Sequence, residues 1–215
     1  MSSPKVSVPV IRRLPRYFRY ITELKESGKT RVSSSQLAAI MGSTPSQVRQ
    51  DFNCFGGFGQ QGIGYSVELL HDEIKHLLFP NANINAVLLG AGSLGATVAN
   101  FVLSETECVN LTAIFDNNPN LVGKNLHNIK IHDADTIVEY CQNNKVDFII
   151  ACIPKAAAEK FAPVLVQTGV KGIWNFTHYD FSIYDSSLVV ENVHMRDSLM
   201  ALSYRISHAE TTEEE

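Results

Sequence analysis

The sequence predicts an α/β protein with an N-terminal winged helix-turn-helix domain, a C-terminal doubly wound parallel sheet and one last helix. Three observations support this fold class. The N-terminal part of the 215-residue chain holds two helix-capping signals and a glycine-rich turn, a second glycine motif follows an apolar strand, and strand and helix patterns then alternate. We expect the domains to span residues 1–79 and 80–192, with the last helix over 193–209 and a disordered acidic tail over 210–215.

Charge is unevenly distributed along the chain. Up to residue 66 there are 9 basic and 3 acidic residues, and beyond it 9 basic and 19 acidic ones, although the formal net charge is only −4. A basic module joined to an acidic body is typical of proteins that bind a polyanion, because Lys and Arg neutralise phosphates. The alternative is a basic face that is merely solvated.

The sequence argues against a membrane or metal protein. No apolar run approaches the roughly 18 to 20 residues that cross a bilayer, and no apolar stretch with a small-residue cleavage site opens the chain. We therefore expect a cytoplasmic protein. The cysteines are widely spaced, without a Cys-x-x-Cys pair or a histidine at metal-ligand spacing, so we predict no metal and reduced, mostly buried thiols. They are Cys54, Cys108, Cys141 and Cys152.

Apolar residues recur at intervals of three or four near the N-terminus, which predicts an amphipathic helix from Pro9 to about Ser27. Its expected inner face consists of Ile11, Leu14, Phe18, Ile21 and Leu24. The other face carries arginines that suit a phosphate backbone but could equally be solvated, namely Arg12, Arg13, Arg16 and Arg19. We take the first three as candidate DNA contacts.

A capping signal predicts the next helix. Ser33 and Gln36 have the spacing of a capping box, and the short helix that follows should end at Gly42.

The same signal recurs at Thr44, which can cap a helix from Pro45 to about Asn53 with Gln47 reaching back to the cap. Two short helices joined by a tight turn form a helix-turn-helix, whose second helix presents polar residues to the major groove. The candidates are Ser46, Gln47, Arg49 and Gln50, while Val48 and Phe52 should face the core.

The segment 55–65 holds five of the chain's 13 glycines, which indicates turns. We predict a β-hairpin wing whose tip approaches DNA. Its candidate contacts are Gly59, Gln60, Gln61, Gly62 and Tyr65. The alternative, a glycine-rich phosphate loop, needs a preceding apolar strand and a Lys-Ser or Lys-Thr ending, and neither is present. A helix over 67–79 and a linker over 80–83 should follow.

A second glycine motif lies in a different context. The apolar strand 86–89 runs into Gly90-Ala91-Gly92-Ser93-Leu94-Gly95, an apolar helix follows, and the strand 111–115 ends at Asp116. Gly90 permits the tight turn, Gly92 lets a pyrophosphate approach, Gly95 allows close helix–strand packing, and the helix N-terminus supplies donors. The context predicts a Rossmann-like dinucleotide site, and the alternative is a βαβ turn with a chance aspartate.

Asp116 lies where a carboxylate accepts hydrogen bonds from the adenosine ribose and repels a 2′-phosphate, which favours NAD(H) over NADP(H). The cofactor-binding candidates of this motif are Gly90, Ala91, Gly92, Ser93, Leu94, Gly95, Ala96 and Asp116.

Further strands are expected at 146–151, 172–176 and 187–190, separated by helices around 133–143 and 156–168. Because ligands bind beyond the carboxyl ends of such strands, further cofactor candidates are Ala151, Ile153, Pro154, Asn175, Phe176 and Thr177.

An enzyme of this fold would need a substrate domain and a positioned acid or base. His178 is the best candidate for a general acid, but no substrate domain is visible in the sequence. We therefore predict no catalytic residue and no enzyme activity.

The chain ends in a helical pattern that begins after His194. Its apolar stripe consists of Met195, Leu199, Leu202 and Ile206. The stripe can pack on its own domain or on a second copy of the chain.

These motifs together resemble the redox-sensing transcriptional repressor family called Rex. The resemblance spans nearly the whole chain. Besides the dinucleotide fingerprint, it rests on Arg13-Leu14-Pro15-Arg16-Tyr17, Arg31-Val32-Ser33-Ser34, Gln47-Val48-Arg49, Phe55-Gly56, Gly62-Ile63-Gly64-Tyr65, Phe115-Asp116, Gly169-Val170-Lys171-Gly172-Ile173, Asn175-Phe176 and Glu191-Asn192-Val193.

The resemblance implies a homodimer of winged-helix and Rossmann domains in which each C-terminal helix is swapped between the partner's domains. It implies binding to operator DNA with NAD or without nucleotide, and release when NADH closes the molecule and separates the recognition helices. Genes of fermentation and anaerobic respiration would be the targets.

Some residues depart from the family's pattern. Gln50 stands where the family usually has Lys, and Gln60-Gln61 replace a commonly basic wing tip, so we expect weaker phosphate binding or a different operator preference. Phe101 stands at a usual Tyr position and His194 at a usual Asp position. In the family, that Tyr and Asp help to link the swapped helix and the cofactor domain with an Arg of the first helix, here Arg19.

His194 could make the response sensitive to pH near neutrality, or it could simply face solvent. Two other function classes stay open at this point. One is a small NAD-dependent oxidoreductase, and the other is a repressor that senses another adenine nucleotide, such as an acyl-CoA.

Overall fold

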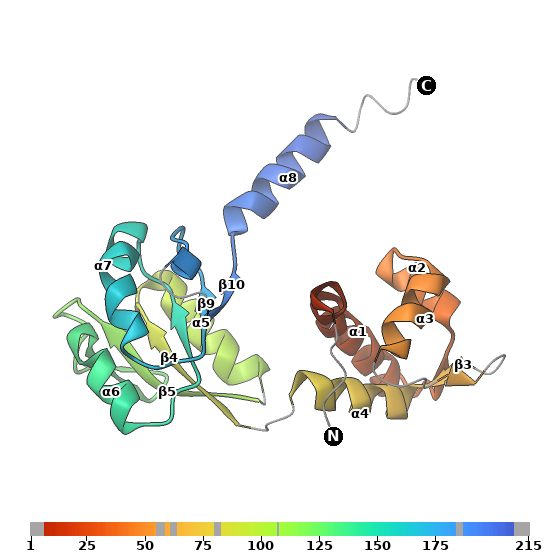
Figure 1. The fold of residues 1–215 in the computed structure, drawn as a ribbon, viewed down its shortest axis with the longest axis horizontal. Helices are drawn as coiled ribbons and strands as arrows, with labels where there is room; N and C mark the ends of the chain where they lie inside the picture. Colours follow the sequence, from red (N-terminus) through yellow and green to blue (C-terminus); the bar gives the residue numbers. More distant parts are fainter. Residues whose placement is uncertain are drawn as a thin grey trace. The chain divides into compact units, whose positions relative to one another are not determined.

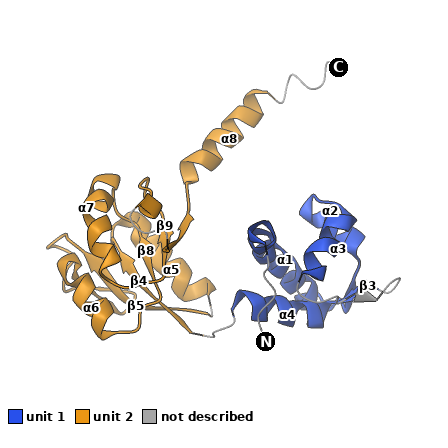
Figure 2. Ribbon diagram, in the orientation of Figure 1, with its two compact units in different colours: residues 1–82 blue, residues 83–215 orange. Residues whose placement is uncertain are grey.

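The structure is a computed structural model that describes residues 7–54, 59–60, 64–79, 83–106, 108–183 and 187–208. The chain divides into two compact units, residues 1–82 and 83–215 (Figures 1 and 2). Several predictions fall outside the described residues: the wing-tip residues Gln61 and Gly62, most of the linker, residue 209 and the acidic tail.

Unit 1 is a set of helices beside a small antiparallel sheet, which matches the predicted winged helix-turn-helix. The helices are α1 (Val8–Glu26), α2 (Ser34–Met41), α3 (Pro45–Asn53) and α4 (Val67–Leu78). The sheet has the order β1 (Arg31–Val32), β3 (Gly64–Ser66) and β2 (Gly59–Gln60). The predicted hairpin is the β2–β3 pair, whereas β1 was not predicted.

The caps of α2 follow the sequence prediction. The Ser33 hydroxyl accepts from the backbone N–H of Gln36, and the Gln36 side chain accepts from the backbone N–H of Ser33, which completes the capping box. Gly42 ends the helix in the left-handed region, at φ 62°.

The cap of α3 is only partly as predicted. The Thr44 hydroxyl accepts from the backbone N–H of Gln47, as expected. The prediction that the Gln47 side chain reaches back to the cap is wrong, because its Nε2 donates instead to Asp51, one turn further along α3, at 2.8 Å.

The core of unit 1 lies between α1, α3 and α4. Val48 and Phe52 of α3 are fully buried, as predicted. On α1 the buried residues are Val10, Leu14, Tyr17 and Ile21. The prediction that Ile11 faces the core is wrong, since 48% of it is exposed. The buried stripe instead includes Tyr17, whose hydroxyl donates to Asp51.

Unit 2 is built on a seven-stranded sheet of order β10-β9-β8-β4-β5-β7-β6. All neighbouring strands are parallel except β6 and β7. The predicted strands are β4 (Ile84–Leu89), β5 (Val109–Asp116), β8 (Phe148–Ala151), β9 (Gly172–Asn175) and β10 (Val189–Asn192). The short strands β6 (Asn125–Leu126) and β7 (Ile129–Asp133) were not predicted.

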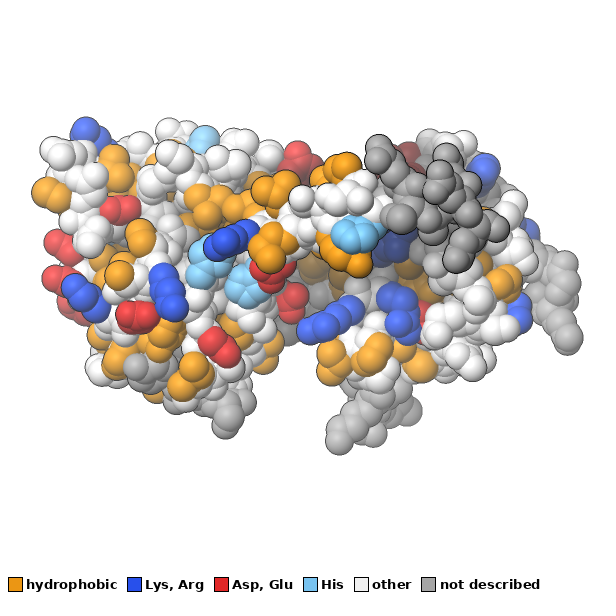
Figure 3. Space-filling model, turned by 90° about the horizontal axis from the view of Figure 1, so that it is seen from above, with side chains coloured by type: hydrophobic (Ala, Val, Ile, Leu, Met, Phe, Trp, Pro, Cys, Tyr) orange, Lys and Arg blue, Asp and Glu red, His pale blue; other side chains and the backbone are white. Residues whose placement is uncertain are grey.

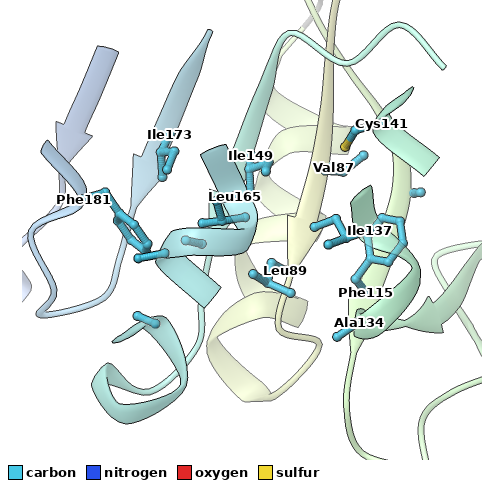
Figure 4. Close-up of a cluster of buried hydrophobic side chains, with 14 residues drawn as sticks. Val87, Leu89, Phe115, Ala134, Ile137, Cys141, Ile149, Leu165, Ile173 and Phe181 are labelled. Carbon is cyan, nitrogen blue, oxygen red and sulfur yellow. The ribbon is translucent and has the colours of Figure 1, made fainter. Parts of the chain in front are cut away.

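Helices cover both faces of this sheet, which confirms the doubly wound, Rossmann-like fold. One face packs against α5 (Ser93–Glu105), and the other against α6 (Ile137–Asn143) and α7 (Lys155–Val166). Alternate residues of β4 belong to the two cores. Leu88 packs in the core beside α5, and Leu89 packs in the core beside α6 and α7 (Figure 4). Two 3₁₀ turns complete the unit, η1 (Ala134–Thr136) and η2 (Phe181–Ile183).

The cysteines are free thiols, as expected, but the prediction that most are buried is wrong. Cys141 is buried in the core beside α6, Cys54 is exposed, and the other two are partly exposed. Among the residues that the structure describes, no group of three or more side chains could hold a metal ion, and no helix is long and apolar enough to cross a membrane.

The last helix, α8 (Met195–Ser207), follows β10 and has no buried residue. The predicted apolar stripe is present but exposed, with 66% of Leu199, 52% of Leu202 and 64% of Ile206 accessible. Hydrophobic side chains accordingly lie on the surface of this part of the molecule (Figure 3). Among the described residues of its own unit, none covers this face of the helix.

Candidate nucleotide site and nucleic-acid interface

The glycine turn between β4 and α5 has the geometry that the sequence predicts. Gly90 has φ +101°, and a Cβ there would lie 2.5 Å from the Cys152 carbonyl oxygen. A Cβ on Gly95 would collide with the Gly90 carbonyl oxygen. Both positions therefore require glycine so that α5 can pack closely against β4 and β8.

Gly92 differs from the other two glycines. It has an ordinary extended conformation, with φ −66° and ψ −172°, and a Cβ there would meet nothing within 4 Å. It precedes Ser93, the first residue of α5, and the first turn of α5 has no side-chain cap. Open space in front of uncapped amides at a helix N-terminus suits a phosphate, which the helix dipole also favours.

Asp116 ends β5 and connects this turn to the next loop. One carboxylate oxygen accepts from the backbone N–H of Ala91 at 2.6 Å, and the other accepts from the backbone N–H of Asn118 at 2.7 Å. Each carboxylate oxygen can accept a second hydrogen bond, so both still have acceptor capacity for ligand hydroxyls.

A cavity of about 330 Å³ lies beside Asp116. It opens where β4, β5 and β8 end, which is the point where the strand order of the sheet reverses. Its lining residues are Leu89, Gly90, Gly92, Asp116, Asn117, Asn118, Leu121, Ala134, Cys152, Ile153, Pro154, Ala157 and Phe161.

Five of the predicted cofactor residues meet in this lining, namely Gly90, Gly92, Asp116, Ile153 and Pro154. Others shape the turn behind it: Ala91, Ser93, Leu94, Gly95, Ala96 and Ala151. Sequence reasoning missed Asn117 and Asn118, although they follow the predicted strand end at Asp116. It had no signal for Ala134, Ala157 or Phe161, which reach the cavity only through the packing of η1 and α7.

One wall of the cavity is apolar and carries a protonated thiol. Burial raises the pKa of Cys152 to about 12, so the side chain is a neutral thiol near neutral pH. With Leu121 and Phe161 it offers a neutral surface to the flat face of a base. Uncapped amides, a carboxylate and apolar walls together fit a dinucleotide.

The predicted residues after β9 form a turn of their own. Asn175 is fully buried, and its Nδ2 donates to the Tyr179 carbonyl at 2.8 Å and to Asn192 at 2.7 Å. Its Oδ1 accepts from the backbone N–H and the hydroxyl of Thr177. These bonds hold the turn together, so a ligand role for Asn175 and Thr177 stays a prediction. Phe176 packs against Trp174, with 4.7 Å between ring centroids.

In unit 1, α3 exposes part of the predicted DNA-contact set, namely Ser46, Arg49 and Gln50. Arg49 donates to the hydroxyls of Ser34 and Ser46, which ties α2 to the start of α3. Arg12 and Arg16 of α1 are exposed as well.

The other members of that set lie elsewhere. Arg13 and Gln47 are both bound to Asp51. Tyr65 is buried in the core, with 7% of it exposed. Gly59 and Gln60 form β2.

Comparison with known proteins decides the family. A protein of Thermoanaerobacter pseudethanolicus named "Redox-sensing transcriptional repressor Rex" is 45% identical over 206 residues, which cover 96% of this chain and 92% of that protein. The chain belongs to the Rex family. The names of its relatives confirm the prediction of a transcriptional regulator rather than an enzyme.

Solved structures agree with this assignment to Rex. One described as RSP in complex with beta-NAD+ and operator DNA matches with a TM-score of 0.88 and 44% identity, over 97% of this chain and 95% of that one. Another, RSP in complex with beta-NADH, matches with a TM-score of 0.88 and 41% identity, over 97% and 98%. The family described as "Putative DNA-binding protein N-terminus" matches residues 5–53, and "CoA binding domain" matches residues 81–179.

Each of the three residues that the family resemblance connects with the swapped helix has an aromatic neighbour. Phe101 is 48% exposed, and its ring centroid lies 6.3 Å from that of Trp174. His194, immediately before α8, stacks on His178 with ring centroids 6.0 Å apart and planes inclined by 10°. Arg19, in unit 1, lies over the Tyr20 ring at 5.1 Å.

Proposed function

We propose that this Rex protein is a homodimeric transcriptional repressor that binds operator DNA and is released by NADH, so that transcription follows the cellular NADH/NAD ratio. The observation that carries the proposal is the open, uncapped N-terminus of α5 beside Asp116, in a chain whose other unit is a winged helix-turn-helix. Such a protein acts where the chromosome lies, in the bacterial cytoplasm.

Two solved relatives support operator DNA and NAD(H) as the ligands, since one was crystallised with beta-NAD+ and operator DNA and the other with beta-NADH. By this proposal Asp116 binds the adenosine ribose, and the amides at the start of α5 bind the pyrophosphate. No basic side chain lies among the residues that line the described cavity, so nothing there would neutralise a 2′-phosphate. This supports NAD(H) as the ligand rather than NADP(H).

Discrimination between the two oxidation states has a simple electrostatic basis. The reduced nicotinamide ring is neutral and the oxidised ring is positively charged, so a site with apolar walls near Phe176 favours NADH by avoiding a buried charge. Because a ligand shifts an equilibrium only by its differential affinity, NADH must bind the released form more tightly than the DNA-bound form.

The DNA-binding surface proposed here consists of the exposed start of α3 and the β2–β3 wing. Ser46, Arg49 and Gln50 would face the major groove, with Arg12 and Arg16 on the phosphate backbone. Gln50, in place of a lysine, would lower the salt dependence of binding.

A homodimer is proposed because no described residue of its own unit covers the apolar face of α8. A second copy of the chain would cover it, and a dimer presents two recognition helices to a palindromic operator. The proposed targets are genes of fermentation and anaerobic respiration.

The test is fluorescence anisotropy of a labelled palindromic operator at fixed salt, titrated separately with NADH, NAD and coenzyme A. We expect release by micromolar NADH and not by NAD or coenzyme A. Operator binding that ignores all three ligands would refute the sensor assignment, and release by coenzyme A alone would support the other adenine nucleotide that the matching domain family suggests. Linkage adds a second check, because the operator must weaken NADH binding by the factor by which NADH weakens operator binding.

A further inference from the structure

We infer that Asp51 is a positioning residue of the recognition helix, and that Arg13 acts in operator binding through Asp51 and not as a phosphate contact. The inference rests on the proposed operator binding. It gives Asp51 a role that the sequence does not indicate, and it replaces the direct DNA contact expected of Arg13 by an indirect role.

The carboxylate of Asp51 accepts hydrogen bonds at all of its acceptor sites. Arg13 donates from Nε to Oδ2 and from Nη2 to Oδ1, both at 2.7 Å. Tyr17 donates its hydroxyl to Oδ2 at 2.9 Å, and Gln47 donates Nε2 to Oδ1 at 2.8 Å. Each carboxylate oxygen accepts about two hydrogen bonds, so these four donors fill the acceptor sites of Asp51. Three of these four donor groups belong to α1, on Arg13 and Tyr17, and the fourth belongs to Gln47 of α3 itself.

The burial of Asp51 shows that this contact is not a surface ion pair. Only 1% of Asp51 is exposed, and it lies on the same helix face as the fully buried Val48 and Phe52. A buried carboxylate carries a desolvation cost, and an apolar residue of similar size is often at least as favourable for stability. What the carboxylate adds is direction, because the three hydrogen bonds that it accepts from α1 set the rotation of α3 about its own axis.

The rotation of α3 matters because its opposite face carries Ser46, Arg49 and Gln50. The hydrogen bonds to α1 therefore fix which side chains α3 presents to DNA. Burial and the hydrogen bond to Asp51 raise the pKa of Tyr17 well above its usual value, so the hydroxyl stays protonated and remains a donor at neutral pH.

Arg13 in this arrangement has little left for a phosphate. Two of its five N–H groups donate to the carboxylate as a bidentate fork, and the pair as a whole carries no net charge. Release of condensed counterions from DNA requires a cation that neutralises a phosphate. Arg13 should thus contribute to operator affinity without contributing to its salt dependence, and this combination distinguishes positioning from direct contact.

The experiment measures operator affinity of full-length wild type, Arg13→Met and Arg13→Lys at several salt concentrations. For Arg13→Met we expect binding about tenfold or more weaker at every salt concentration, with an unchanged slope of log affinity against log salt. Arg13→Lys should lose nearly as much, because an ammonium cannot form the bidentate fork. A slope lower by about 0.9, with affinity retained in Arg13→Lys, would show a phosphate contact and overturn the inference.

Controls separate this result from the simple loss of one positive charge and from a failure of the proposed function. Lys130→Met removes one positive charge from an exposed position on β7 and should change neither affinity nor slope. The double variant Arg13→Met/Asp51→Asn should bind no more weakly than the weaker single variant, whereas independent roles predict additive losses. Wild-type protein that binds no operator would refute the proposed function, while a changed slope in Arg13→Met refutes only the role of Asp51.

Discussion

Replacing Gly92 by alanine should separate ligand binding from folding. In the structure a Cβ at this position meets nothing within 4 Å, and the backbone at φ −66° is one that alanine adopts readily. Replacement of glycine by alanine at the helix cap costs about 0.5–1 kcal/mol, and the lower entropy of the unfolded chain returns about 0.4–1 kcal/mol. The free energy of unfolding should therefore stay within about 0.5 kcal/mol of the wild-type value.

NADH binding should respond very differently, because the new methyl group would occupy the space in which we place the pyrophosphate. Overpacking by one methyl group typically costs about 1–3 kcal/mol, which corresponds to binding about 5- to 150-fold weaker. Fluorescence titration of NADH and thermal unfolding of the same preparation measure both quantities. Wild-type NADH affinity in Gly92→Ala would refute the placement of the phosphates at α5.

Gly95→Ala is the matched comparison. Its Cβ would collide with the Gly90 carbonyl oxygen, so α5 must move away from β4. We expect this variant to lose thermal stability and NADH binding together. A stable Gly92→Ala beside an unstable Gly95→Ala would show that Gly92 is needed for ligand binding and Gly95 for the packing of α5.

Three further outcomes follow from particular contacts. Burial would raise the pKa of Asp51, but hydrogen bonds from Arg13, Gln47 and Tyr17 outweigh it and hold that pKa below 3.8. The contribution of Asp51 to stability is therefore complete above pH 3.8 and is lost as the pH falls through the lower, folded-state pKa. Asp51→Asn should lower the free energy of unfolding by about 2 kcal/mol at pH 7, and the difference in Tm from wild type should disappear in acid. A difference in Tm that does not depend on pH contradicts this. With its pKa at about 12, Cys152 should react with a thiol reagent far more slowly than the exposed Cys54, and about tenfold faster for each pH unit between 7 and 11, as followed by peptide mass spectrometry. Leu202→Glu should convert the dimer to monomer in sedimentation while NADH binding to the folded chain persists, and an unchanged dimer would exclude this face of α8 as the interface.

The elements that could be predicted from sequence are those specified by local chemistry. The caps Ser33 and Thr44 define where α2 and α3 begin, and the glycine motif defines the turn between β4 and α5. In each case the signal and the structure it specifies lie within a few residues of one another.

Elements specified by distant partners could not be predicted in this way. β1 and β6 have two residues each and exist only through pairing with β3 and β7. The bond between Arg13 and Asp51 joins residues 38 positions apart, so the periodicity of α1 alone assigned that arginine to solvent or DNA. The cavity walls contributed by η1 and α7 depend in the same way on how the helices pack on the sheet.

Coupling between nucleotide and operator requires an element that packs differently in two states. Each unit has its own closely packed core, and such cores resist continuous deformation. The helix α8 is different, because no residue of it is buried in its own unit and because its start is marked by the stacked pair His178 and His194. A helix whose apolar face is covered by another chain can change its packing without unfolding either core. The two states of this repressor should therefore differ most at α8, which begins immediately after His194.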